Sequence, residues 1–77
     1  MNDKFEKITK IIEEIADISV DEMAEDSSLV DDLDLSSLEI MSVISEVEKE
    51  FKVKIQSSEL TSVDTISDLI ELIESKG

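Results

Sequence analysis

Apolar residues recur at helical spacing in three stretches of the chain, and each stretch predicts a helix. At about 100° per residue, the apolar positions of residues 3–17 gather on one face. Similar stripes predict a second helix over residues 37–52 and a third that opens at Asp64 or Thr65. The stripes consist of Phe5, Ile8, Ile12, Ile15 and Ala16, with Ile11 alongside; of Ile40, Val43, Ile44, Val47 and Phe51; and of Ile66, Leu69, Ile70 and Ile73, with Leu72 beside them.

The segments between these stripes have no sustained period. Residues 18–35 are rich in Asp, Glu and Ser and predict a long loop, a feature that is uncommon in compact domains and often functional. Residues 52–55 alternate but are too few for a strand alone, and Ser57 and Ser58 predict the cap of one helical turn through Leu60. We expect the loop to be held on the core by its isolated apolar residues, Ile18, Val20, Met23, Leu29, Val30, Leu33 and Leu35.

The pattern as a whole predicts an all-α fold. Three longer helices and one short helix would form a small bundle, with the long loop between the first two helices. Asp3 with Glu6 is an acidic variant of the capping pattern and predicts where the first helix begins.

The entrance to the second helix carries the most specific local motif. Ser36 and Glu39 form Ser-x-x-Glu, the capping box that starts a helix. If Ser36 is the cap, Ser37 is the first helical residue, and its hydroxyl is free of capping and held in a defined place. A phosphate joined there would lie near unpaired backbone N–H groups and the positive end of the helix dipole. A serine so placed suits carrying a phosphodiester better than attacking a substrate.

Two apolar residues of this helix, Leu38 and Met41, fall well off the buried stripe and close to the direction of Ser37. Scattered exposed apolar residues are normal on protein surfaces. The residues alone therefore leave two interpretations open, an ordinary surface or a docking spot beside the serine.

Composition narrows the function classes. The 77 residues suffice for one small domain, 1–77, and contain neither histidine nor cysteine, which excludes ordinary triad and zinc hydrolase chemistry. The net charge of −14 disfavours nucleic acid and anionic membranes and favours partners with basic patches. No targeting segment or apolar run long enough to span a bilayer is apparent. We expect a cytoplasmic monomer.

Other chemistries fit the sequence poorly. Asp32-x-Asp34-x-Ser36 is similar to the start of a calcium-binding loop, but Ser37 stands where that loop needs glycine, and Val43 where it needs glutamate. No metal site is therefore predicted. The glycines of a hydrolase nucleophile elbow are missing too, and acidic pairs in so acidic a chain are more often a solvated face than a catalytic dyad. The sequence indicates that the protein is not an enzyme.

Several segments together resemble the acyl carrier proteins, and the resemblance covers nearly the whole chain. Each segment is weak alone, but their order and spacing are specific. They are Ser28-Leu29-Val30-Asp31-Asp32-Leu33, Ser36-Ser37-Leu38-Glu39, Glu46-Val47-Glu48-Lys49-Glu50-Phe51, and Ile55.

The resemblance implies that Ser37 carries 4′-phosphopantetheine as a phosphodiester, attached by a phosphopantetheinyl transferase from coenzyme A. Ser36 stands where the family usually has aspartate, which keeps a good cap but loses one charge and puts the choice of transferase in question. Attachment to Ser36 is the alternative, disfavoured because Ser37 is the serine followed by leucine.

The resemblance also implies roles for other residues. Partner enzymes with basic patches would dock on Ser36, Leu38, Glu39, Met41 and Glu48. Ser42 and Lys49 depart from the acids common in fatty acid carriers and favour a specialised carrier over the housekeeping one. The growing acyl chain would be sheltered by Leu29, Val43, Val47, Ile55, Leu60, Val63, Ile66 and Leu69, which are also ordinary core candidates.

The implied function is the tethering of acyl intermediates as thioesters in fatty acid or polyketide-type biosynthesis. The acyl-loading and chain-elongating or acyl-transfer enzymes would be the partners. Two alternatives stay open at this point. A peptidyl, aminoacyl or aryl carrier would use the same serine for a different cargo, and an unmodified acidic helical module would bind a basic partner without any attached group.

Overall fold

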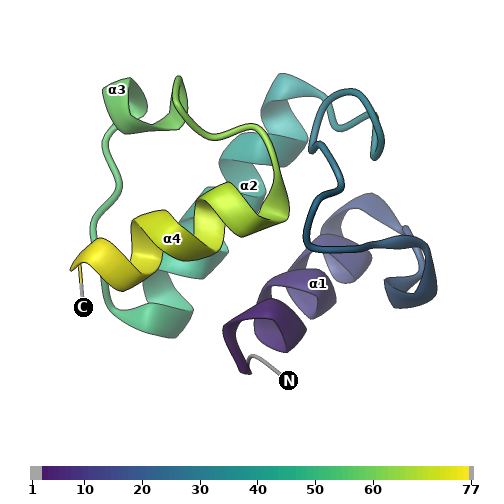
Figure 1. Cartoon of the computed structure of the whole chain (residues 1–77), viewed down its shortest axis with the longest axis horizontal. Coiled ribbons are helices and arrows are strands. Elements are labelled where there is room, and N and C mark those ends of the chain that lie inside the picture. Colours follow the sequence, from purple (N-terminus) through teal and green to yellow (C-terminus); the bar gives the residue numbers. More distant parts are fainter. Residues whose placement is uncertain (1–2, 77) are drawn as a thin grey trace.

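The structure, a computed structural model, describes residues 3–76. This part of the chain forms the helices α1 (Asp3–Ala16), α2 (Ser37–Phe51), α3 (Ser57–Leu60) and α4 (Ile66–Lys76), with a 3-10 helix, η1, at Val20–Glu22 (Figure 1). The described residues contain no β-strand, only an isolated antiparallel bridge between Ser28 and Thr65. The predicted all-α fold of three longer helices and one short helix is confirmed.

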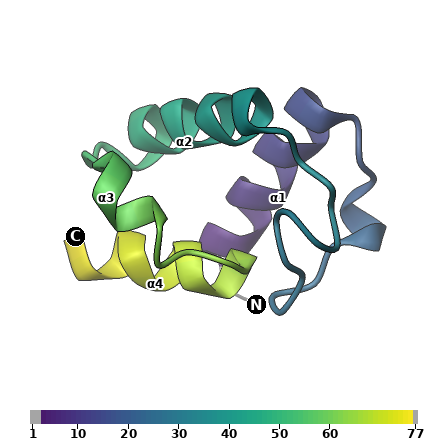
Figure 2. The same ribbon diagram turned by 90° about the horizontal axis from the view of Figure 1, so that it is seen from above.

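Helix α1 packs against both α2 and α4, and the three apolar stripes meet in one core. In both views α3 and the 18–35 loop lie on opposite sides of the molecule (Figures 1 and 2). Figure 2 shows α3 on the side of the molecule where α2 and α4 both end, and Figure 1 shows it separated from the end of α2 by the connecting segment. The buried apolar core consists of Ile8, Ile12, Met23, Leu29, Leu33, Leu35, Val43, Ile44, Val47, Ile55, Ile66, Leu69, Ile70 and Ile73.

Helix α1 differs from its predicted bounds by one residue at its end. Asp17 takes a left-handed conformation with φ of 58° and stops the helix at Ala16. Asp3 is already helical, so the predicted cap at Asp3 is wrong. Thr9, which the apolar pattern passes over, is fully buried, and its hydroxyl donates to the carbonyl of Glu6 at 3.0 Å.

Helix α2 ends at a left-handed residue. Lys52 has φ of 56° and ψ of 47°, and the N–H groups of Lys52 and Val53 both donate to the carbonyl of Glu48. The bond from Val53 is the long one of a Schellman motif and the bond from Lys52 is that of the simpler left-handed cap, formed here without the usual glycine. The helix therefore ends at Phe51, one residue before the predicted end.

Side-chain caps start the last two helices. Thr65 caps α4, since its hydroxyl accepts from the N–H of Asp68 at 3.1 Å while the Asp68 carboxylate accepts from the N–H of Thr65. The prediction of Asp64 or Thr65 as the opening of this helix is confirmed. For α3 the predicted cap is wrong: Gln56 is the capping position and Ser57 is already helical, because the Glu59 carboxylate accepts from the Gln56 N–H at 2.9 Å.

The long loop is more ordered than its sequence predicts. The N–H groups of Asp32 and Leu33 both donate to the carbonyl of Ser28, which forms a tight turn. Leu29 and Leu33 face the core from this turn, whereas Val30 points outward and is 55% exposed. The expectation that Val30 holds the loop on the core is therefore wrong.

The first part of the loop contains η1, which the sequence did not predict. Its cap is Ser19, whose hydroxyl accepts from the N–H of Asp21 at 3.3 Å. Val20 is only half-buried in this turn, and Ile18 packs against the edge of the core.

None of the helices within residues 3–76 combines the length and the apolar character that crossing a bilayer requires.

Candidate functional site

The predicted capping box at the start of α2 is confirmed. Ser36 has extended backbone angles, and its hydroxyl accepts from the N–H of Glu39 at 3.3 Å. The Glu39 carboxylate accepts in return from the N–H of Ser36 at 2.9 Å. The box occupies the Ser36 hydroxyl and fixes the residue at which the helix begins.

Ser37 is the first residue of α2 and is exposed. Within residues 3–76 its hydroxyl has no hydrogen-bond partner, in contrast to that of Ser36. The N–H groups of a first helical turn lack acceptors inside the helix and favour a negative charge beside them. An accessible hydroxyl next to such groups fits a covalently bound phosphate.

The backbone that leads to Ser37 is fixed by hydrogen bonds to the start of α4. The N–H of Leu29 donates to the carbonyl of Asp64 at 2.8 Å, and the N–H of Ile66 donates to the carbonyl of Ser27 at 3.2 Å. Farther along, the N–H of Leu35 donates to the carbonyl of Leu29 at 3.0 Å. Because Leu35 is also buried, the chain reaches Ser36 from an anchored position.

Ser28 is the buried polar centre of this anchor. Its side chain is almost fully covered, and its hydroxyl donates to the Asp64 carboxylate at 2.8 Å and accepts from the N–H of Asp31 at 3.1 Å. The Asp32 carboxylate accepts from the N–H of Ser28 at 2.7 Å. Asp34 takes a left-handed conformation with φ of 55°. Among the described residues no three acidic side chains are grouped to hold a metal ion.

Leu38 and Met41 lie on the surface beside Ser37, as their position on the helix predicted. They are 77% and 64% exposed, respectively. The two acidic residues expected to contact partners, Glu39 and Glu48, each accept a backbone hydrogen bond that the docking prediction did not include. One oxygen of Glu39 serves the capping box, and one oxygen of Glu48 accepts from the N–H of Ile55 at 2.8 Å. Docking at Ser36, Leu38, Glu39, Met41 and Glu48 stays a prediction.

A hollow of about 170 Å³ lies between α2 and α3, here called the α2–α3 cleft. On α2 its lining falls at positions i+4, i+7, i+8 and i+11 from Ser37, which lie on the same side of the helix as that serine. The helical spacing of these residues from Ser37 is the signal in the sequence that could have identified this side of the cleft. The lining residues are Met41, Ile44, Ser45, Glu48, Ile55, Ser57 and Leu60.

A larger hollow of about 510 Å³ lies between α1 and α2. Ser42 and Glu46 line it from a side of α2 that is turned well away from Ser37. The α2–α3 cleft is therefore the better candidate for a function that involves Ser37, despite its smaller volume.

The eight residues expected to shelter an acyl chain divide into three groups. Ile55 and Leu60 line the α2–α3 cleft. Val63 is partly buried at the edge of the core. The other five pack inside the closed core, namely Leu29, Val43, Val47, Ile66 and Leu69.

Two carboxylates of the described residues have altered pKa values. The N–H of Gln56 and then the Lys76 ammonium lower the pKa of Glu59, because both interactions favour the charged form. The N–H groups of Thr65 and Asp64 lower the pKa of Asp68 in the same way. Neither group lies beside Ser37, so they act on the fold and on α3.

Comparisons with known proteins place the chain among carriers. The sequence profile of the phosphopantetheine attachment site matches residues 6–73. The chain is 32% identical to the acyl carrier protein of Thermotoga maritima over 94% of this chain and 89% of that protein. It is 34% identical to the acyl carrier protein of Buchnera aphidicola over 100% and 98% of the two chains. It is 31% identical to polyketide-8 synthase acyl carrier protein 2 of Streptomyces avermitilis over 92% and 82%.

Proposed function

Because the chain belongs to the acyl carrier protein family, we propose that it tethers acyl intermediates as thioesters on a 4′-phosphopantetheine arm attached to Ser37. The family consists of carriers, so the protein is not an enzyme, and its cofactor is covalently bound 4′-phosphopantetheine. The proposal concerns which residue bears the arm and what cargo the arm carries.

The observation that carries the proposal is the difference between two neighbouring serines. The Ser36 hydroxyl is held by the capping box, whereas the Ser37 hydroxyl is exposed and without a partner within residues 3–76. The oxygen of Ser37 would lose its proton and attack the pantetheine-bearing phosphate of coenzyme A. The pyrophosphate bond would break, adenosine 3′,5′-bisphosphate would leave, and the first-turn N–H groups of α2 would lie near the negative charge of the new phosphodiester. The thiol of the bound arm supplies the chemistry, since it holds an acyl group as a thioester.

The chain's own contribution is placement. The capped helix and the anchored loop hold the Ser37 oxygen at one point of the surface. A cargo tethered there has a high effective concentration at the active site of any enzyme that docks. The acyl group of the cargo would enter the α2–α3 cleft between encounters, since the cleft lies along the same face of α2.

The partners follow from the family and from the charge. We propose brief, salt-sensitive docking of the transferase and of acyl-transfer enzymes through basic patches, which the net charge of −14 would attract. Leu38 and Met41 would supply the apolar contact of this docking surface. Matched relatives include proteins named as acyl carrier proteins and one named for a polyketide synthase. The departures at Ser36, Ser42 and Lys49 support the specialised type.

Attachment to Ser37 is tested by incubating the protein with coenzyme A, Mg²⁺ and a broad-specificity transferase, followed by intact mass measurement. We expect one phosphopantetheine to be added to the wild-type protein and none to Ser37→Ala. Ser36→Ala is the matched control, because it removes the neighbouring hydroxyl and should still accept one group.

Two results would contradict the proposal. A wild-type protein that gains no mass would favour the unmodified acidic interaction module. A Ser37→Ala protein that is modified as well as the wild type would place the arm elsewhere, with Ser36 the first alternative. Mass measurement of the group on the native protein distinguishes an acyl cargo from an aminoacyl cargo.

A further inference from the structure

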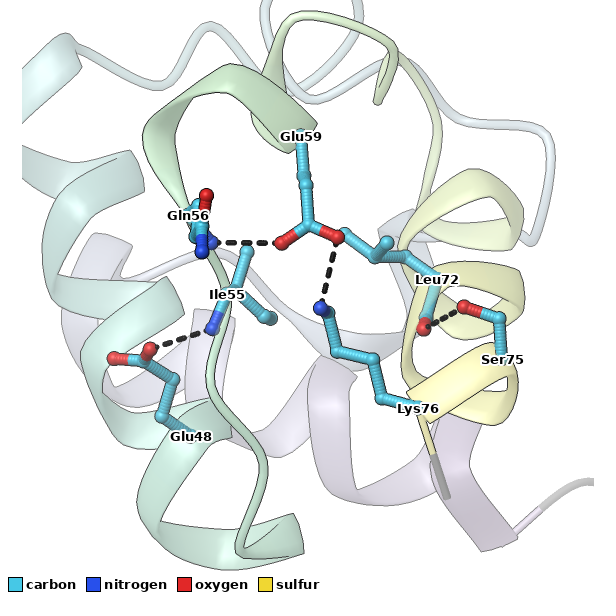
Figure 3. A network of polar contacts seen from close by, with 7 residues as sticks. All are labelled: Glu48, Ile55, Gln56, Glu59, Leu72, Ser75 and Lys76. Carbon is cyan, nitrogen blue, oxygen red and sulfur yellow. Dashed lines mark hydrogen bonds and ion pairs between the residues drawn. The ribbon is translucent and has the colours of Figure 1, made fainter.

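The segment between α2 and α3 is held by two carboxylates. Its consecutive N–H groups, those of Ile55 and Gln56, donate to Glu48 of α2 at 2.8 Å and to Glu59 of α3 at 2.9 Å (Figure 3). Hydrogen bonds to an ionised acceptor are about twice as strong as neutral ones. The wall of the cleft is thus joined to α2 at the point where the chain turns towards α3.

The other side of α3 is joined to the last turn of α4. The Lys76 ammonium lies 2.8 Å from the Glu59 carboxylate, and Figure 3 shows its side chain reaching from α4 to α3. Of the ion pairs within residues 3–76 this one is the least exposed, at 23% for the Lys76 side chain and 31% for that of Glu59. Glu59 therefore contacts the turn and α4 at the same time.

Little else fixes α3. It has only four residues and none of them is fully buried. Within the described residues the extensive helix packing is that of α1 with α2 and with α4. Leu60 and Val63 pack on the edge of the core, and Ile55 just before the helix is buried in it. The polar contacts of Glu48 and Glu59 add to these and join α3 to its neighbours.

We propose that Glu48 and the Glu59–Lys76 pair form a clamp that sets the distance of α3 from α2 and thereby limits the length of the acyl chain that the α2–α3 cleft accepts. The proposal rests on the proposed function, because it names the size of the cargo. Glu48, Glu59 and Lys76 are positioning residues in this scheme and need not touch the cargo head group.

The lining explains why the distance matters. Met41, Ile44, Ile55 and Leu60 give the cleft an apolar surface, but its volume is only about 170 Å³. Each further methylene that leaves water favours the sheltered state by roughly a factor of four. A longer chain gains this only if α3 moves outward, and that movement breaks the contacts of Glu48 or Glu59.

The first test uses the unmodified protein and needs no arm. In Glu48→Ala we expect hydrogen exchange of the Ile55 amide to rise roughly tenfold or more, because its acceptor is removed and the turn opens locally. The amide of Val47, a buried residue of α2, should keep its wild-type exchange rate. Glu46→Ala is the matched control, since Glu46 lies on the same helix and pairs with Lys49 at 3.8 Å outside the cleft.

The second test uses the protein loaded with straight-chain acyl groups of increasing length and measures thioester cleavage by hydroxylamine. Wild type should protect short chains and lose protection as the chain grows. In Glu48→Ala and in Lys76→Met the loss should shift to longer chains, whereas Lys49→Met, which breaks the exposed ion pair with Glu46, should match wild type.

The outcomes separate the two proposals. Unchanged exchange of the Ile55 amide in Glu48→Ala overturns the clamp, whether or not Ser37 carries an arm. A length limit identical in wild type, Glu48→Ala and Lys76→Met also overturns it. Failure to load Ser37 refutes the proposed function, while the exchange measurement still decides whether the clamp exists.

Discussion

Ser36 and Ser37 carry the same side chain but have different surroundings because they differ by one helical position. The hydroxyl of Ser36 accepts from the N–H of Glu39 and is used by the fold. The hydroxyl of Ser37 is exposed and unused. The availability of a serine oxygen at this site is therefore decided by its place in the capping box and not by residue type.

The cap of α4 makes a prediction about pH. The N–H groups of Thr65 and then Asp64 lower the pKa of Asp68, so its charged form stabilises the folded state. A lowered pKa contributes fully above the ordinary value and is lost as the pH falls through the folded-state value. We expect Asp68→Asn to melt below wild type at neutral pH, and the difference to close below about pH 4.

The melting temperatures of both proteins across this pH range provide the measurement. Glu71→Gln, on the exposed side of α4, removes the same charge and controls for the change in net charge. Asp68→Asn and Glu71→Gln that melt alike at every pH would show that the hydrogen bonds of Asp68 add nothing.

At the level of single residues, the sequence predicted the contacts that depend only on a few consecutive residues, such as the capping box of residues 36–39. Ser36 and Glu39 meet because they are neighbours on one helical turn, whatever the rest of the chain does. The bond from Ile55 to Glu48 was not predictable, because it depends on the path of the irregular residues between α2 and α3. Burial of the Ser28 hydroxyl against Asp64 likewise requires segments 36 residues apart to meet.

Helix α2 ends at a strained residue. A left-handed conformation costs a non-glycine residue roughly 1–2 kcal/mol, and Lys52 adopts it with φ of 56°. We expect Lys52→Gly to raise the free energy of unfolding by about 0.5–1 kcal/mol, because the relief of strain exceeds the added entropy of the unfolded chain. Urea unfolding measures the change.

Lys54→Gly is the matched control for this prediction. Lys54 is exposed and lies two residues later in backbone without a positive φ. Glycine should therefore lower the free energy of unfolding there by about 0.4–1 kcal/mol through the unfolded state alone. Destabilisation by both substitutions would show that the conformation of Lys52 is not strained.

The helices themselves were predictable to within one or two residues, because apolar period and caps are properties of short windows. The exceptions have physical causes. A polar segment gave no period from which to predict η1 at Val20–Glu22. Val30 points outward because the turn at Ser28 directs Leu29 and Leu33 inward. The place of α3 depends on contacts with α4 that no local pattern reports.

The whole molecule carries far more negative than positive charge. Within residues 3–76 four ion pairs involve Lys4, Lys7, Lys49 and Lys76, against 21 acidic residues in the chain. Like charges repel in the compact state, and salt screens them as the Debye length falls from about 30 Å at 0.01 M to about 3 Å at 1 M. We expect the melting temperature to rise by roughly 5 °C or more over this range of NaCl.

A variant with three fewer negative charges tests the cause. Glu13→Gln, Glu14→Gln and Asp26→Asn together remove charges that form no ion pair within residues 3–76. This variant should melt above wild type at low salt and gain less from added NaCl. An equal gain in both proteins would assign the effect to salt and apolar surface instead of charge repulsion.

The hydrogen bonds that join residues 27–29 to residues 64–66 affect how a tethered cargo reaches successive enzymes. Backbone on one side of Ser37 is tied to α4, and on the other side it is helical. The attachment point at Ser37 is therefore fixed relative to the rest of the fold. How far a substrate is delivered must depend on the span of the prosthetic group and on rotation of the entire body, not on a hinge in the polypeptide.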